Sequence, residues 1–179
     1  MTSERSAAPH RSNAGFEALF EAHHDFIRRS GLALGVPASI VDDVVQDVFI
    51  VALRRLGDLD PRASARGWLY GILRNVARRT KAKHARPPLH LAPRPDAPPD
   101  EALDWRRAAG VVEGFLASLD HDKREVFVLC ELEGMTAPEA AAATGTKLNT
   151  IYSRLRTVRA LFAKTLSRED ARRKRTSPR

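Results

Sequence analysis

The fold is decided at residues 40–56, IVDDVVQDVFIVALRRL, because this stretch can be interpreted either as a strand or as a helix. Its many Val and Ile residues favour a strand. Its periodicity favours a helix, since the apolar residues at positions 41, 44, 45, 48, 52 and 56 share one helical face. A run of 17 residues is also too long for a usual strand. We therefore predict an amphipathic helix, with Ser39 and Asp42 resembling a capping box at its start.

The composition is that of a basic globular chain. Its 179 residues include 30 Lys and Arg against 22 Asp and Glu, a formal net charge of +8, and 43% are hydrophobic. No apolar run is long enough to span a membrane and no signal peptide is visible, so we expect a cytoplasmic protein without membrane insertion. The single cysteine, Cys130, excludes an internal disulfide and a thiolate metal cluster. The basic charge makes nucleic acid the first partner to consider.

Proline divides the chain, because six of its 11 prolines fall between positions 87 and 99. Residues 85–104 have neither a helical nor an alternating period, which predicts a Pro-rich linker. Helical periodicity occupies 14–84 and 105–167, and we expect disorder at 1–13 and in the basic tail, 168–179. Aromatic residues are only 6% and hairpin turn pairs are absent, so strands are not expected. The predicted fold is all-α, with two small helical domains joined by the linker.

The C-terminal segment predicts a helix-turn-helix. Thr136 is the expected N-cap of a short helix, and Glu139 completes its capping box. A turn at 144–146 follows, then a longer helix at 148–164, and no Asp or Glu occurs from 140 to 168. A recognition helix of this kind lies in the major groove of DNA. Asn149, Tyr152, Ser153 and Arg156 are expected to point outward. Arg and Asn side chains can read base edges bidentately, and Lys147 and Arg154 are expected to hold phosphates. The alternative is an ordinary amphipathic helix with a solvated basic face.

A second basic surface is predicted on the helix at 66–83. Residues 66–86 contain seven cations and no acid. Tyr70, Arg74 and Arg78 share one helical face, and Trp68 lies where the basic run begins. Aromatic rings beside a cationic track suit single-stranded nucleic acid, because bases stack and phosphates pair. The alternatives are a core position for Trp68 and a solvated surface for the face of Tyr70.

The helix at 40–56 presents the opposite charge. Asp43, Gln46 and Asp47 lie on the face opposite its apolar residues, where they would repel phosphates. This face suits a basic protein partner, with Ile50 and Phe49 adding apolar contact. Without a family context, a merely solvated acidic face is the simpler interpretation.

These stretches together resemble the sigma-70 family of bacterial RNA polymerase sigma factors, in its two-domain extracytoplasmic-function group. Residues 42–49 (DDVVQDVF) are similar to region 2.2, and residues 68–77 (WLYGILRNVA) to regions 2.3 and 2.4. Residues 119–141 and 150–155 (TIYSRL) are similar to region 4. The matches run in order across both helical segments, which a shared helix-turn-helix alone would not give. Arg79 departs from the family, standing where many members carry Asp.

The resemblance implies three binding surfaces and no cofactor. Core RNA polymerase would be bound, at the clamp helices of its β′ subunit, by Asp43, Gln46, Asp47 and Phe49. The melted minus-10 element of the promoter would be held by Arg66, Trp68, Tyr70, Arg74, Asn75 and Arg78. The minus-35 duplex would be read by Lys147, Asn149, Thr150, Tyr152, Ser153, Arg154 and Arg156. Region 4 would also contact the β flap of the polymerase, and an anti-sigma factor is a further candidate partner.

Two other functions stay open on the sequence alone. A stand-alone helix-turn-helix regulator would bind duplex DNA specifically without polymerase. A general RNA- or single-strand-binding protein would need only the basic face at 66–86. An enzyme is not expected: His23 and His24 project about 100° apart on a helix, and no Asp, Glu and His cluster has ligand spacing.

Overall fold

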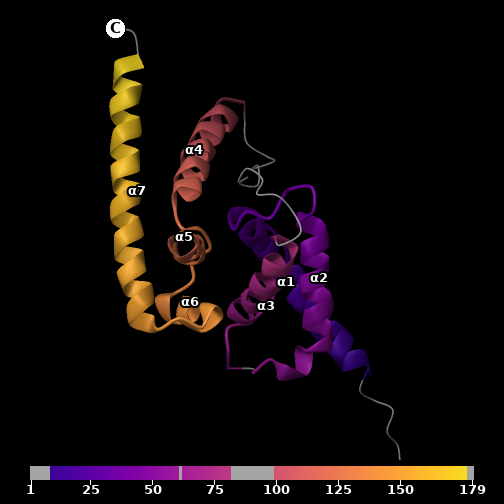
Figure 1. Cartoon of the computed structure of the whole chain (residues 1–179). Coiled ribbons are helices and arrows are strands. Elements are labelled where there is room, and N and C mark those ends of the chain that lie inside the picture. The colour runs from indigo at the N-terminus through magenta and orange to yellow at the C-terminus, as the bar shows by residue number, and fades with distance from the viewer. Residues whose placement is uncertain (1–8, 61, 82–98, 177–179) are drawn as a thin grey trace, which may run out of the picture.

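The computed structural model describes residues 9–60, 62–81 and 99–176, and this described part contains helices and no strand (Figure 1). The N-terminal unit comprises α1 (Pro9–Ala33), α2 (Val41–Arg54), the 3-10 turn η1 (Leu56–Asp58) and α3 (Ala65–Lys81). The C-terminal unit comprises α4 (Pro99–Ser118), α5 (His121–Phe127), the π-helical turn η2 (Val128–Leu132), α6 (Ala137–Thr144) and α7 (Leu148–Thr176). The all-α prediction is confirmed.

The helical interpretation of residues 40–56 is also confirmed. Helix α2 buries its apolar stripe: Val41, Val44, Val45, Val48, Phe49 and Ala52. The capping predicted for Ser39 is wrong, because Ile40 is the N-cap and no side chain bonds there. Asp42 accepts instead from Arg28 Nε of α1 at 2.9 Å. The carboxylates of Asp42 and Asp43 lie in the first turn of α2, where negative charge interacts favourably with the positive end of the helix dipole.

Helices extend beyond the predicted segments at three places. Helix α1 begins at Pro9 and α4 at Pro99, inside the expected N-terminal disorder and the expected linker. Proline fits the first helical position because its missing N–H has no helical partner there. Helix α7 continues to Thr176, through most of the expected basic tail. The rest of the predicted linker, residues 82–98, lies outside the described residues, as do residues 1–8 and 177–179.

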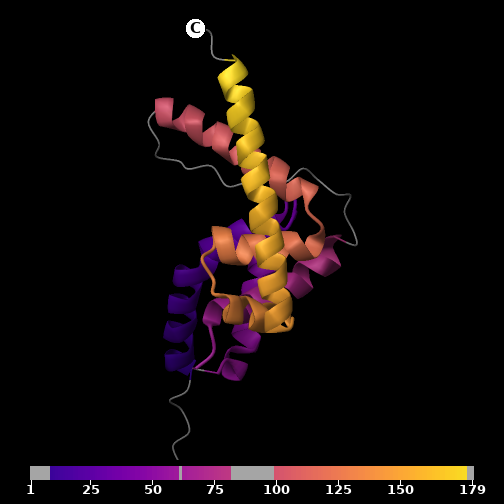
Figure 2. The same cartoon turned by 90° about the vertical axis from the view of Figure 1, so that its left-hand side faces the viewer.

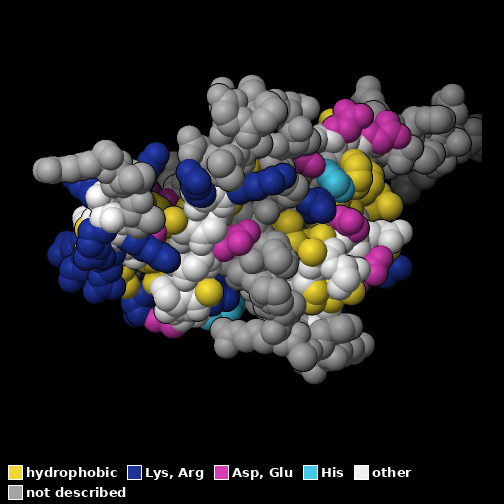
Figure 3. Space-filling view, turned by 90° about the horizontal axis from the view of Figure 1, so that it is seen from above, with side chains coloured by type: hydrophobic (Ala, Val, Ile, Leu, Met, Phe, Trp, Pro, Cys, Tyr) yellow, Lys and Arg dark blue, Asp and Glu magenta, His cyan; other side chains and the backbone are white. Residues whose placement is uncertain are grey.

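The last turn of α7 carries three cations, Arg173, Lys174 and Arg175. Positive side chains at a helix C-terminus stabilise the last turn through the helix dipole. Figure 3 shows Lys and Arg side chains gathered at this end of the molecule. The basic residues that we expected in a disordered tail therefore lie in the last turn of a helix.

The predicted helix-turn-helix is confirmed as α6, a turn and α7. Thr136 Oγ1 accepts from the Glu139 N–H at 3.4 Å, and the Glu139 carboxylate accepts from the Thr136 N–H at 2.8 Å. This reciprocal pair is the capping box expected from the sequence. Gly145 ends α6 with φ 64°, a left-handed conformation that glycine adopts without strain.

The two units pack directly against each other, which the linker did not suggest. In Figure 1 and Figure 2, α6 lies beside α3. One hydrophobic core joins buried residues of α1, α2 and α3 with Val126, Leu129 and Ile151 of the C-terminal unit. A second core around Phe115 and Phe127 includes Ala33 of α1. The two units therefore form one packed body, in which both α1 and α3 contact the C-terminal unit.

Candidate functional site

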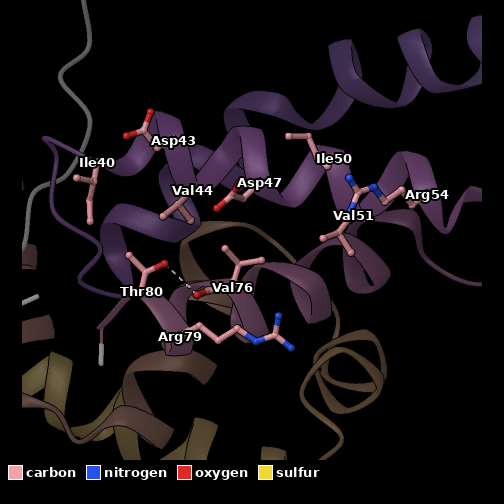
Figure 4. Close-up of a pocket in the computed structure, with 10 residues that line it drawn as sticks. All are labelled: Ile40, Asp43, Val44, Asp47, Ile50, Val51, Arg54, Val76, Arg79 and Thr80. Atoms are coloured by element: carbon pink, nitrogen blue, oxygen red, sulfur yellow. Dashed lines mark hydrogen bonds between the residues drawn. The ribbon is translucent and has the colours of Figure 1, made fainter. Parts of the chain in front are cut away.

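The acidic face of α2, formed by Asp43, Gln46 and Asp47, is exposed. Asp43 and Asp47 line a groove of about 670 Å³ between α2 and α3, together with apolar side chains such as Val51 and Val76 and with two cations, Arg54 and Arg79 (Figure 4). Carboxylates beside an apolar groove complement a partner that is both basic and apolar. Three of the four residues predicted to bind polymerase thus lie on one accessible face.

The fourth, Phe49, is 3% exposed. Its ring lies edge-on to Phe16, with centroids 6.3 Å apart, and to Phe20, with centroids 4.7 Å apart. Phe49 therefore holds α1 against α2 in this structure and does not face a partner. The large apolar side chains that do reach solvent nearby are Phe20, Ile50 and Leu53. Of these three, the sequence pattern indicated only Ile50.

The residues predicted to hold the minus-10 strand do not form one exposed surface on α3. Tyr70 is fully buried, while the side chains of Arg66 and Arg74 are 34% and 41% exposed. All three face the C-terminal unit. Trp68 is half-buried against the core. The two that face solvent, further along α3, are Asn75 and Arg78.

Glu125 of α5 is the partner of Tyr70 and Arg74. The Tyr70 hydroxyl donates to Glu125 Oε1 at 3.2 Å, and Arg74 Nε lies 3.0 Å from the same oxygen. The Glu125 side chain is 1% exposed, and burial raises its pKa against the opposing effect of Arg74. Burial, with the nearby Glu125 charge, raises the pKa of Tyr70 well above its ordinary value. Arg74 also donates to the carbonyl oxygen of Thr144 at 2.7 Å.

Glu133 makes the second set of contacts between the units. Its carboxylate, in a side chain 6% exposed, accepts from Arg29 Nε at 3.1 Å and Arg29 Nη2 at 2.9 Å. Arg66 donates to the Glu133 carbonyl oxygen at 2.7 Å and lies over the Phe26 ring, 4.4 Å from its centroid. No short-range pattern marked Arg29 or Glu133, because each completes a contact with a residue far away in the sequence.

The predicted recognition helix, α7, keeps its N-terminal face open to solvent. Thr150 is half-buried. Arg154 is also half-buried and pairs with Asp122 of α5, so its guanidinium is engaged within the C-terminal unit. The remaining predicted minus-35 residues are exposed: Lys147, Asn149, Tyr152, Ser153 and Arg156.

Among the described residues, no group of three or more His, Cys, Asp or Glu side chains is arranged to hold a metal ion. Cys130 is half-buried, and burial raises the pKa of its thiol. Over the same described ranges, no helix has the length and apolar character needed to cross a membrane.

Comparison with known proteins connects these surfaces to one family. Residues 19–87 match the model of sigma-70 region 2, and residues 111–161 match sigma-70 region 4. The chain is 32% identical over 154 residues to the RNA polymerase sigma factor NccH of Alcaligenes xylosoxydans xylosoxydans, covering 81% of this chain and 83% of the relative. It is 30% identical over 156 residues to the sigma factor RpoE of Cereibacter sphaeroides, covering 85% and 86%.

Solved structures of sigma factors also resemble this chain. The chain resembles CnrH in complex with the cytosolic domain of CnrY, with a TM-score of 0.65, 30% identity, and 87% and 89% of the two chains covered. It resembles in fold RpoE bound to the anti-sigma factor NepR from Bartonella quintana, with a TM-score of 0.70, 21% identity, and 86% and 97% covered. The chain belongs to the sigma-70 family of RNA polymerase sigma factors, in the extracytoplasmic-function group.

This protein is therefore a sigma factor, which binds core RNA polymerase and directs promoter-specific initiation of transcription. A stand-alone helix-turn-helix regulator is not favoured, because the N-terminal unit matches region 2. The N-terminal and C-terminal units correspond to regions 2 and 4.

Proposed function

We propose that this sigma factor binds core RNA polymerase through the acidic face of α2, at the clamp helices of the β′ subunit. Asp43 and Asp47 would pair with basic side chains, and the groove between α2 and α3 would receive a helix of the partner. The proposal rests on the exposure of Asp43, Gln46 and Asp47 on this face. The two exposed carboxylates would repel DNA phosphates and attract basic side chains of a protein, while Arg54 and Arg79, which line the same groove, would pair with acidic ones.

The promoter contacts would be divided between α3 and α7. Asn149 and Arg156 have side chains that read base edges bidentately, and Lys147 is placed for a phosphate. On α3, Asn75 and Arg78 are the accessible part of the surface for the melted strand. Two small units bind weakly alone, but tethering both to one polymerase makes the second contact effectively intramolecular.

The partners would be core polymerase, including its β flap at region 4, and promoter DNA. Such partners would put the protein in the cytoplasm, and its role would be binding, without a cofactor or a reaction of its own. RpoE of Bartonella quintana is held by the anti-sigma factor NepR. By extension, an anti-sigma factor would compete with polymerase for the acidic face of this chain.

The proposal is tested by capturing core RNA polymerase with the purified chain. Asp43→Arg/Asp47→Arg should abolish capture at physiological salt without unfolding the chain, because both side chains are exposed. Glu169→Arg/Asp170→Arg, which makes the same charge change on exposed residues of α7, should capture polymerase as well as the wild type. Equal capture by both double variants would refute the role of the acidic face.

A further inference from the structure

Helix α7 is tied to the segment before the helix-turn-helix by two ion pairs. Arg154 pairs with Asp122 of α5, and Arg159 Nε lies 2.8 Å from Glu131 Oε1 of η2. In Figure 1, α5 lies beside α7, and the two helices are in direct contact. Both pairs therefore connect the predicted recognition helix to its support within the C-terminal unit.

The two arginines lie on opposite flanks of α7. Successive residues of an α-helix are about 100° apart around its axis, so Arg154 and Arg159 are separated by about 140°. The buried stripe of α7, formed by Ile151, Leu155 and Val158, lies between them. An ion pair on each side of a buried stripe resists rotation of the helix about its own axis, because rotation in either direction lengthens one of the two pairs.

The rotation of α7 decides which side chains meet DNA. Asn149 and Arg156, the proposed base readers, are exposed and lie about 140° and 160° from Arg154 around the helix. Side chains extend about 5–6 Å from the axis, so a rotation of about 20° moves them by roughly 2 Å. Hydrogen bonds need donor–acceptor distances of about 2.7–3.2 Å, so such a rotation is enough to break contacts with base edges.

The same geometry separates Arg154 from the face that would read DNA. Its side chain is 26% exposed, and its guanidinium already meets the Asp122 carboxylate. A phosphate contact, which the sequence led us to expect, would require this ion pair to break. The structure thus favours a role for Arg154 in orienting α7.

We propose that Asp122 and Glu131 are positioning residues for DNA recognition, which act through Arg154 and Arg159 to fix the rotation of α7. The inference rests on the proposed function in one respect, the assignment of α7 to duplex DNA. Neither carboxylate has to touch DNA, and each would repel phosphates if it did. The two acids therefore oppose DNA binding by their charge and favour recognition by the orientation that they give to the helix.

The pairs are suited to orientation more than to stability. One partner in each pair is more than half exposed, Asp122 at 54% and Arg159 at 62%. Ion pairs at such exposure contribute little to folding stability, since water and salt screen them. The buried stripe of α7 stays packed whether or not the pairs are present. Removing a carboxylate should therefore loosen the orientation of α7 and leave the fold intact.

Neutralising the two carboxylates tests their role. Asp122→Asn and Glu131→Gln each remove one negative charge and keep the size of the side chain. Their matched controls are Asp170→Asn and Glu169→Gln, which make the same changes on exposed residues of α7. The wild-type chain first selects a preferred sequence from random duplexes of about 20 base pairs, two turns of DNA. The dissociation constants of all chains are then compared on this duplex and on a shuffled one.

Both test variants should discriminate less well between the two duplexes, by about fivefold or more, which is the discrimination that one good base contact provides. Their affinity for the shuffled duplex should not fall, because each variant is more positive than the wild type. The controls should keep the discrimination of the wild type. Unchanged discrimination in either test variant, or a wild type that selects no sequence, would overturn the proposal.

Charge reversal separates positioning from contact with DNA. Asp122→Arg and Arg154→Asp should each lower discrimination, and the double variant should restore it, because the pair forms again with its charges exchanged. A double variant as defective as Arg154→Asp would refute the positioning role. Circular dichroism confirms that each variant is folded.

Salt dependence on the shuffled duplex gives an independent readout of phosphate contacts. Lys147→Ala should reduce the slope of log affinity against log salt concentration by about one, whereas Arg154→Ala should leave the slope unchanged. A slope reduced by about one in Arg154→Ala would identify a phosphate contact and contradict the proposal. Core polymerase is absent from these assays, so failure of polymerase capture would refute the proposed function and leave these results intact.

Discussion

The substitution Arg74→Ala should show how much the ion pair with Arg74 contributes to the stability of a fold that buries the Glu125 carboxylate. The Glu125 side chain is 1% exposed and lies 3.0 Å from Arg74 Nε, so Arg74→Ala leaves a buried carboxylate without its cation. Breaking a fully buried pair in this way costs about 3–5 kcal/mol. The Arg74 side chain is 41% exposed and water would enter the vacated space, so we expect about 1–3 kcal/mol of lost unfolding free energy near neutral pH.

The unfolding free energy that Arg74→Ala loses should become smaller as the pH falls. Burial raises the pKa of Glu125 even with Arg74 present, and removing Arg74 should raise it further. A carboxyl with a raised folded-state pKa contributes stability that is fully present below its ordinary pKa and is lost as pH rises through the raised pKa. Protonated Glu125 needs no cation. The difference in stability between the wild type and Arg74→Ala should therefore shrink as the pH falls toward the ordinary pKa of a glutamate, and the part that comes from the hydrogen bond of Arg74 to the Thr144 carbonyl oxygen should remain.

Urea unfolding of four chains at about pH 7.5 and about pH 5 measures this effect: wild type, Arg74→Ala, Glu125→Gln and the double variant. His121 also acts on the pKa of Glu125, and the two chains that carry Glu125→Gln provide the reference because they lack the carboxylate. Arg78→Ala, on the exposed part of α3, is the matched control and should change stability little. If Arg74→Ala loses the same free energy at both pH values and in the Glu125→Gln background, the pairing is not the cause.

Further substitutions test the capping box of α6, the burial of Phe49 and the DNA contact of Arg156. Thr136→Ala removes the capping box of α6 and should lower the free energy of unfolding by about 1 kcal/mol, measured in urea, whereas an unchanged midpoint would mean that water replaces the cap. Phe49→Ala should destabilise the chain by about 3–5 kcal/mol, while the exposed Ile50→Ala should not, and the reverse order would contradict their burial. Arg156→Ala should weaken binding by about 1–3 kcal/mol at one base position, and an equal loss on every duplex would instead identify a phosphate contact.

Features set by local sequence were predictable. The period of residues 40–56 placed the buried stripe of α2 and, opposite it, the exposed Asp43 and Asp47. The Thr136–Glu139 spacing and Gly145 located the helix-turn-helix, because capping and left-handed turns depend on neighbouring residues. Phe49 could have been placed as well, since it lies four residues after the buried Val45.

Features set by distant contacts were not predictable. Tyr70 and Arg74 share a basic helical face that the sequence presents as a surface for nucleic acid, and only the fold brings Glu125 onto it. A Pro-rich linker gives no information about whether the units that it joins also touch. Glu133 lies in the stretch that resembles region 4, but its pairing with Arg29 could not be predicted, because ion pairs between distant residues leave no periodic signal.

The central claim is that this chain directs initiation by core RNA polymerase, and the most direct measurement is transcription itself. Core polymerase is incubated with the purified chain on fragmented genomic DNA from the same organism, and the 5′ ends of the transcripts are sequenced. The account predicts start sites that require the chain, share upstream elements, and disappear with Asp43→Arg/Asp47→Arg. Start sites identical to those of core polymerase alone, while the chain still binds duplex DNA specifically, would contradict it.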